Sequence, residues 1–143
     1  MNKQAKENIA AFGHENIQAV HPTTLMFTKE RQLSATGDCI VAVGADKALA
    51  DLTQTFKDAL RKTNAKLTII IEAAGLCEQI NASGSPKLIL THQNDIVIRK
   101  SSYISDRTLA INADKSSNDL SRELVAILKN PKQMITIRLT VQS

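Results

Sequence analysis

The fold is decided by the stretch "ENIAAFGHENIQAVH" at residues 7–21, because "EQINASGSPKLILTH" at residues 78–92 carries Glu, Ile, Ala, Gly and His in the same register. The two stretches lie 71 positions apart, and six of the 24 aligned positions from residue 7 onward are identical. Apolar residues also face apolar residues at further aligned positions, such as Phe27 and Ile98. A long internal period of this kind is typical of a repeated structural unit.

A second match extends the period toward the C-terminus. The stretch "GDCIVAVGADKALADL" at residues 37–52 aligns with "SDRTLAINADKSSNDL" at residues 105–120, with seven identities in 16 positions and an offset of 68. We therefore predict a single domain at residues 1–143, built from two copies of one unit at about residues 7–74 and 78–141. The recurring segment is then the first strand and hairpin of each unit.

Each predicted unit contains short apolar runs that are typical of β-strands. The first two runs are separated by three polar or turn-forming residues, which predicts a tight hairpin. The predicted strands lie at residues 16–21, 25–30, 40–44 and 66–71 in the first unit, and at 87–92, 96–101, 108–112 and 134–141 in the second.

The apolar spacing changes to a period of 3.6 between the third and fourth predicted strand of each unit, which indicates an amphipathic helix. Cationic residues near the end of each apolar stripe suit the negative end of the helix dipole. The apolar faces consist of Leu49, Leu52, Phe56, Ala59 and Leu60 in the first helix, and of Leu120, Leu124, Ile127 and Leu128 in the second.

These elements predict an α+β protein in which the strands are predominantly antiparallel. About eight to ten short strands and only two helices require that strand faces cover one another. We therefore expect two units related by a pseudo-twofold axis, forming a jelly-roll-like β-sandwich or a closed barrel with two flanking helices.

The composition is that of an ordinary soluble domain, with 43% hydrophobic and 22% charged residues. The N-terminal stretch "MNKQAKENIA" lacks the apolar core of a signal peptide, so we expect a cytoplasmic protein that does not interact with membranes. The two cysteines, Cys39 and Cys77, lie far apart, which predicts reduced thiols and no metal site.

The formal net charge of +4 mildly favours a polyanionic partner, because a basic surface attracts phosphates. The basic residues are nevertheless scattered along the chain and interleaved with acidic ones. One Tyr, three Phe and no Trp argue against a platform that stacks several unpaired bases.

Three stretches resemble a known family: "TTLMFTKE" at residues 23–30, "GDCIVAVGADKA" at 37–48 and "RKSSYISDRTLAINADK" at 99–115. They are similar to an archaeal family of short proteins known only as domain of unknown function three-seven-one. The resemblance covers nearly the whole chain and implies an archaeal cytosolic protein with a jelly-roll-like β fold. It implies no activity.

The twin "ADK" motifs are the first candidates for chemistry. Asp46 and Asp114 precede the predicted helices, where a carboxylate caps free amide groups. Lys47 and Lys115 would then lie in the first helical turn, where a cation opposes the helix dipole. The lysines either form an anion site with the free amides or extend into solvent.

Paired histidines and aspartates form a second set of candidates. His21 and His92 end equivalent predicted strands, where each ring either bonds to a turn or approaches the pseudo-twofold axis as a base or ligand. Asp38 and Asp106 enter equivalent turns, where an aspartate commonly bonds to its own backbone.

The densest group of basic and hydroxyl residues is "RKSSYISDR" at residues 99–107, which includes Arg99, Lys100 and Tyr103. This segment is either a loop that holds a phosphate or a solvated strand edge that discourages aggregation.

The sequence leaves two classes of function. The first is a non-catalytic module that binds an anionic ligand, either a phosphorylated metabolite or a nucleic acid, through Lys47, Lys115 and the segment that contains Arg99 and Lys100. The second is a small enzyme whose site is built from the paired histidines and aspartates. We favour the first, because no P-loop, dinucleotide-binding fingerprint or nucleophile elbow is present. The sequence assigns no cofactor and no oligomeric state.

Overall fold

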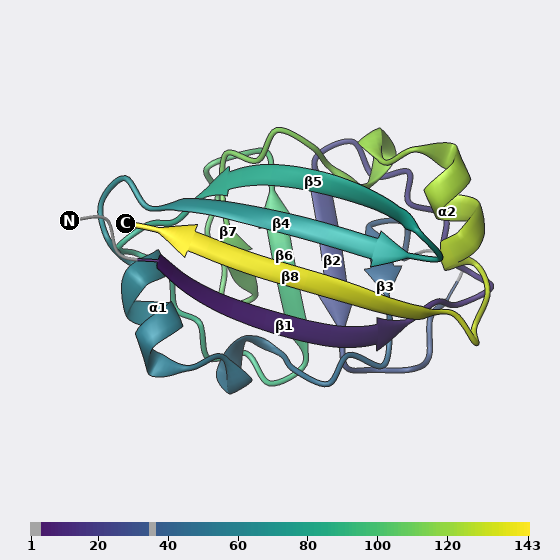
Figure 1. Ribbon diagram of the computed structural model, residues 1–143. Helices are drawn as coiled ribbons and strands as arrows, with labels where there is room; N and C mark the ends of the chain where they lie inside the picture. Colours follow the sequence, from purple (N-terminus) through teal and green to yellow (C-terminus); the bar gives the residue numbers. More distant parts are fainter. Residues whose placement is uncertain (1–3, 35–36) are drawn as a thin grey trace.

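The computed structural model describes residues 4–34 and 37–143, and Figure 1 shows its ribbon. These residues form eight strands, two α-helices and two short 3₁₀ helices. The strands are β1 (Gln4–Phe12), β2 (Thr24–Thr28), β3 (Ile40–Ala42), β4 (Lys66–Ala73), β5 (Leu76–Ser83), β6 (Asp95–Arg99), β7 (Thr108–Ala110) and β8 (Met134–Gln142). The helical elements are η1 (Leu49–Asp51), α1 (Gln54–Leu60), η2 (Ser117–Asp119) and α2 (Arg122–Leu128).

The first sheet has the strand order β1–β8–β4–β5, and all neighbouring strands are antiparallel. The last strand of the chain, β8, therefore lies between β1 and β4. Buried and more exposed residues alternate along β8, because successive side chains of a strand point to opposite faces. Its buried residues are Ile135, Ile137, Leu139 and Val141.

The second sheet has the strand order β3–β2–β6–β7. Its central pair, β2 and β6, is antiparallel, whereas β3 and β7 run parallel to their neighbours. The side chains of Leu25, Phe27, Ile96 and Ile98 enter the hydrophobic core. The predicted α+β class with mostly antiparallel strands is thus confirmed.

The two sheets form two layers, and the first sheet lies in front of the second in Figure 1, with the strands of one crossing those of the other. One hydrophobic cluster contains residues of both sheets and of both helices, such as Ile69, Phe27 and Phe56. Isolated bridges from Phe12 to Val43 and from Ser83 to Ile111 join the sheets at their ends. The alternative of a closed barrel is wrong, because the described strands form two four-stranded sheets that isolated bridges, and not a continuous ladder, connect.

Six of the predicted strand pieces are confirmed, and two are wrong. Residues 16–21 and 87–92 form no strand, although their side chains alternate between buried and exposed as in a strand. The cause lies in the backbone, since Ala19 has φ of 52° and Leu90 has φ of 60°. These left-handed residues interrupt an extended ladder. The predicted hairpins therefore do not form.

Each α-helix has seven residues and begins after a hydroxyl N-cap. The Thr53 side chain accepts a hydrogen bond from the Phe56 N–H, and the Ser121 side chain accepts one from the Leu124 N–H. Both helices begin later than predicted, because Leu49 belongs to η1 and Leu120 is the C-cap residue of η2. In the described part of the chain, no helix is long and apolar enough to cross a membrane.

Glycine-containing segments cap the C-terminal end of each helix from the other half of the chain. The Ser85 N–H donates to Leu60 O at the end of α1, and the Gly84 N–H donates to Ala65 O beyond it. At the end of α2, the His14 N–H donates to Leu128 O in the same way. A Cβ atom at Gly84 would overlap Leu60 O, and one at Gly13 would overlap Leu128 O. Glycine is required here by the close approach of two backbones.

We predict that Gly84→Ala lowers the free energy of unfolding by about 2–4 kcal/mol, because the methyl group displaces the segment that caps α1. Gly75→Ala is the matched control. Gly75 has φ of 82°, but nothing lies within 4 Å of an added Cβ, so its cost is only the backbone strain of about 1 kcal/mol. Urea denaturation of both variants measures the difference. Equal losses would show that the close approach at Gly84 is not what requires glycine.

Candidate functional site

Lys47 pairs with a buried carboxylate. Its Nζ atom lies 2.8 Å from Oε1 of Glu7, whose side chain is 4% exposed. The other oxygen, Oε2, accepts a hydrogen bond of 2.7 Å from the backbone N–H of Thr53, the N-cap of α1. Burial raises the pKa of Glu7, but the bonds from Lys47 and Thr53 outweigh it, and the net pKa is below its usual value. Glu7 therefore ties β1 to the start of α1.

Lys115 makes the corresponding contact in the second half. Its Nζ atom lies 3.0 Å from Oε1 of Glu78, and Oε2 of Glu78 accepts a bond of 2.6 Å from the Ser121 N–H. Burial again raises the pKa of Glu78, whereas the bonds from Ser121 and Lys115 lower it below its usual value overall. Glu7 lies on β1 and Glu78 on β5, at opposite edges of the first sheet. Lys47 and Lys115 are therefore bound at opposite edges of this sheet.

The expectation that Asp46 and Asp114 cap the α-helices is wrong, because the N-caps are Thr53 and Ser121. Asp46 instead accepts a hydrogen bond from the Ala10 N–H on the open edge of β1. Asp114 accepts the equivalent bond from the Asn81 N–H on the edge of β5. Both aspartates complete the backbone hydrogen bonding of an edge strand.

The two histidines hold turns. Nδ1 of His21 accepts hydrogen bonds from the N–H groups of Thr23 and Thr24, both at 3.1 Å. Nδ1 of His92 accepts bonds from the N–H groups of Asn94 and Asp95, at 3.2 and 3.0 Å. The interpretation of each ring as a turn-bonded side chain is confirmed.

The histidines do not meet at a common point. Each lies just before the first residue of β2 or β6, and the antiparallel register places Thr24 opposite Arg99 and Asp95 opposite Thr28. The two strand starts are therefore four residues apart along the ladder, which is roughly 14 Å. No hydrogen bond joins the two rings within the described residues. A site that needs both rings would have to span this distance.

The two aspartates are also in different surroundings. The backbone oxygen of Asp38 accepts bonds from the Val20 N–H and from the Ser117 hydroxyl, which also contacts His21 O. Asp106 is exposed, and its side chain has no hydrogen bond or ion pair to any other described residue. Within residues 4–34 and 37–143, no group of three or more His, Cys, Asp and Glu side chains could hold a metal ion.

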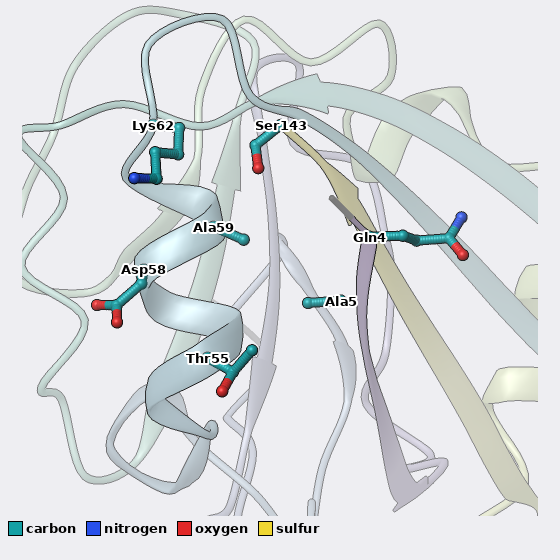
Figure 2. Close-up of a pocket in the computed structure, with 7 residues that line it drawn as sticks. All are labelled: Gln4, Ala5, Thr55, Asp58, Ala59, Lys62 and Ser143. Carbon is teal, nitrogen blue, oxygen red and sulfur yellow. The ribbon is translucent and has the colours of Figure 1, made fainter. Parts of the chain in front are cut away.

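A pocket of about 420 Å³ lies between α1 and the ends of β1 and β8. Figure 2 shows Thr55 and Ala59 of α1 facing Ala5 of β1, while Asp58 and the side chain of Gln4 point away from that space. Two of its polar side chains thus point away from the space, whereas the polar groups of a small-molecule site usually point toward the ligand.

Arg99, at the end of β6, is a half-buried cation without a carboxylate partner among the described residues. Its Nε atom donates to Oγ1 of Thr108 at 3.0 Å, and its Nη2 atom donates to Oγ of Ser105 at 3.1 Å. Its Cζ atom lies 5.0 Å from the centroid of the Tyr103 ring. Burial, followed by the positive charge of Arg107, lowers the pKa of Arg99. No anion among the residues that the structure describes pairs with this guanidinium.

Arg107 brings a second guanidinium to this region. Its Nη1 atom lies 2.9 Å from Oδ2 of Asp95, whose other oxygen accepts a bond from the Thr28 hydroxyl. Burial and the negative charge of Asp38 raise the pKa of the nearby Cys39 thiol, so this cysteine is protonated at neutral pH and is a poor nucleophile. Two arginines and several hydroxyls form what we call the Arg99 cluster: Arg99, Tyr103, Ser105, Arg107 and Thr108.

Lys100, expected to share this site, is directed elsewhere. Its Nζ atom lies 2.7 Å from Oδ2 of Asp119 in η2. The hydrogen bond from Lys100 lowers the pKa of Asp119 to about 2. Lys29 makes the equivalent pair with Asp51 in η1, at 2.6 Å.

The chain matches a known protein family over most of its length. The model of a family described as a domain of unknown function, DUF371, matches residues 9–142. The chain belongs to the DUF371 family. The uncharacterized protein MJ0206 of Methanocaldococcus jannaschii is 49% identical over 127 residues, which cover 89% of this chain and 93% of that protein. The resemblance to an archaeal family of unknown function is thereby confirmed.

Sequence reasoning missed several residues that shape this DUF371 chain. It gave no role to Glu7 and Glu78, although both stand at the start of the recurring stretch and are identical in the two copies. It also missed Thr108 and Ser105, which hold Arg99. Their contacts depend on the parallel pairing of β7 with β6, which no local pattern indicates.

We predict that Lys47→Gln lowers the free energy of unfolding at pH 7 by about 1–2 kcal/mol, because it leaves the buried Glu7 carboxylate with only the Thr53 N–H. The ionised form of Glu7 stabilises the fold above its unfolded-state pKa near 4.5, and this contribution is lost as the pH falls through the lower folded-state pKa. The difference between the two proteins should therefore shrink below about pH 4.

Urea denaturation as a function of pH measures this effect, and two variants control it. Lys6→Gln removes an exposed lysine from the same strand and should change stability by less than about 0.5 kcal/mol. Lys115→Gln should cost less than Lys47→Gln, because Glu78 is 14% exposed and Glu7 is 4% exposed. A pH-independent loss in Lys47→Gln would refute the role assigned to the ion pair.

Proposed function

We propose that the protein is a non-catalytic module that binds a small phosphorylated ligand at the Arg99 cluster. The observation that supports this proposal is the half-buried guanidinium of Arg99, which is held by two neutral hydroxyls and an aromatic ring rather than by a carboxylate. A positive charge in such a position costs free energy unless an anion joins it. Bound phosphate would supply that anion.

The donors of Arg99 suit an oxyanion. A guanidinium carries five N–H groups in a planar fork, and two of them bond to Thr108 and Ser105. The two hydroxyls fix the side chain while three N–H groups, both on Nη1 and one on Nη2, have no partner among the described residues. Pre-oriented arginine forks are well suited to phosphate, because they donate two parallel hydrogen bonds.

A small ligand agrees better with the charge pattern than a nucleic acid does. Most cations of the described residues already have a carboxylate or carbonyl partner. The lysines with carboxylate partners are Lys29, Lys47, Lys100 and Lys115, and the basic residues bonded to backbone carbonyls are Lys57, Arg61, Arg122 and Lys129. Nucleic-acid binding usually needs several free cations in a row.

We also infer that the chain is an internal duplication whose two units are related by a pseudo-twofold axis. The strand register supports this inference. In the first sheet Ile70 pairs with Arg138, its counterpart at an offset of 68, and in the second sheet Met26 pairs with Val97, its counterpart at an offset of 71. Under this relation Arg99 corresponds to Thr28, so only the second unit would carry the anion site.

The duplication predicts that residues 7–72 of an experimentally determined structure will superpose on residues 78–141. Helices and central strands should align, with His21 over His92 and Asp46 over Asp114. A crystal structure provides the coordinates for this comparison. Different strand orders in the two segments would mean that the repeated letters are a coincidence.

For the anion site we predict saturable binding of inorganic phosphate, with the Nε–H signal of Arg99 shifting in NMR spectra during the titration. Arg99→Gln should weaken binding about tenfold or more, because charge-assisted hydrogen bonds are lost. Arg138→Gln is the matched control, since Arg138 is an exposed arginine paired with Glu72 at 3.3 Å on the outer face of the first sheet. It should leave the affinity unchanged.

Two results would contradict the proposal. The first is equal phosphate affinity in the wild type and Arg99→Gln, with both proteins folded as judged by thermal melts. The second is salt-sensitive binding of duplex DNA or RNA in a mobility-shift titration that Arg99→Gln does not alter, since this would assign the anionic partner to another surface.

A further inference from the structure

We propose that the ligand of the Arg99 cluster is a mononucleotide, whose base stacks on Tyr103 while its phosphate binds Arg99. This inference rests on the phosphate-binding function proposed above and extends it to the rest of the ligand. Tyr103 is 63% exposed, more than any other large hydrophobic side chain of the described residues. A phosphate bound to Arg99 would not by itself cover this exposed ring, whereas a ligand with an aromatic group would.

The environment of the Tyr103 ring suits stacking. One side of the ring is occupied by Arg99, whose Cζ atom lies 5.0 Å from the ring centroid. The exposure of the side chain leaves much of the ring open to solvent. Every nucleobase has a flat aromatic face, and stacking on tyrosine is a common way to bind one. A nucleotide joins such a face to a phosphate through one ribose, so a single molecule would engage both groups.

The loop that carries Tyr103 is fixed before any ligand binds. The Tyr103 N–H donates to Oγ of Ser101 at 3.3 Å, and the backbone oxygen of Ser101 accepts a bond of 3.0 Å from the Asn112 N–H. Further along, the Ser105 N–H donates to Oγ1 of Thr108 at 2.9 Å, the same atom that holds Arg99. The Tyr103 backbone and the Arg99 guanidinium are thus each held by bonds to hydroxyl groups, which lowers the entropy lost on binding.

The number of exposed aromatic rings distinguishes a site for a single nucleotide from a site for a single-stranded nucleic acid. Single-stranded nucleic acids are usually held by several aromatic side chains in succession. In this chain Phe27 and Phe56 are fully buried, and Phe12 is half-buried with Arg31 at 5.6 Å from its ring centroid. Tyr103 is therefore the one aromatic platform of the described residues, and it has room for one base.

The test uses intrinsic fluorescence, because the chain has one Tyr and no Trp and its tyrosine emission comes from Tyr103 alone. Three probes are titrated into the full-length protein: AMP, ribose 5-phosphate and adenosine. AMP should quench the emission and bind about tenfold more tightly than ribose 5-phosphate, which has no base. Adenosine, which lacks the phosphate, should bind most weakly. Free N-acetyltyrosinamide corrects for light absorbed by adenine.

Calorimetry on two variants identifies the contact. Tyr103→Ala should abolish the preference for AMP over ribose 5-phosphate, because the ring on which the base stacks is lost. Tyr103→Phe should keep the preference for AMP, because stacking needs the ring and not the hydroxyl. Thermal melts verify that both variants fold.

The outcomes separate the two proposals. If ribose 5-phosphate binds and AMP binds no more tightly, the nucleotide inference fails while the phosphate site stands. If none of the phosphorylated probes binds, the proposed function itself fails. Affinity for single-stranded oligonucleotides that rises steeply with their length would also overturn the inference, since it would require further base sites. Equal binding of adenosine and AMP would show that Arg99 does not anchor the phosphate.

Discussion

The position of β8 constrains the rest of the structure. The last strand of the chain lies between β1 and β4, so β1 joins the first sheet only through residues at the C-terminal end. Most of the pairing in this sheet therefore connects distant parts of the sequence. Loop-closure entropy opposes such pairing until the whole sheet is assembled, which favours cooperative folding over stepwise folding. The two halves are not separable layers, because each sheet contains strands from both.

The carboxylates of the buried Glu7 and the half-buried Glu78 then set where the helices lie. Glu7 and Glu78 reach from the edge strands of the first sheet to the N-cap residues of α1 and α2, and Lys47 and Lys115 neutralise them. Glu7 and Glu78 thus accept hydrogen bonds from amide groups at the helix starts, which is the role that the sequence predicted for the aspartates of the "ADK" motifs. In contrast to these satisfied ion pairs, Arg99 has only neutral partners. That difference separates a cation that stabilises the fold from one that is available to a ligand.

The sequence was informative where a local pattern determines the structure. The strands β2, β3, β4, β6, β7 and β8 follow from apolar runs, and the burial of Phe56 and Leu124 follows from helical spacing. It failed at residues 16–21 and 87–92, because the left-handed backbone of Ala19 and Leu90 keeps an alternating burial pattern without a strand partner. Partners of side chains were the least predictable. The bond from Arg99 to Thr108 depends on strand order, which composition and periodicity do not encode.

The glycine segments at the helix ends carry a consequence for shorter chains. In this protein the backbone at Gly84 and Ser85 satisfies carbonyls at and beyond the end of α1, while that at His14 satisfies the end of α2. A chain that ended near residue 75 would hold α1 but not the segment that completes it. Under the duplication that we infer, the segment at Gly13 and His14 of a second molecule would take its place. If the two halves arose by duplication, as we infer, a half-length relative would need a second copy to complete its helix, and fusion of the halves would remove this dependence on protein concentration.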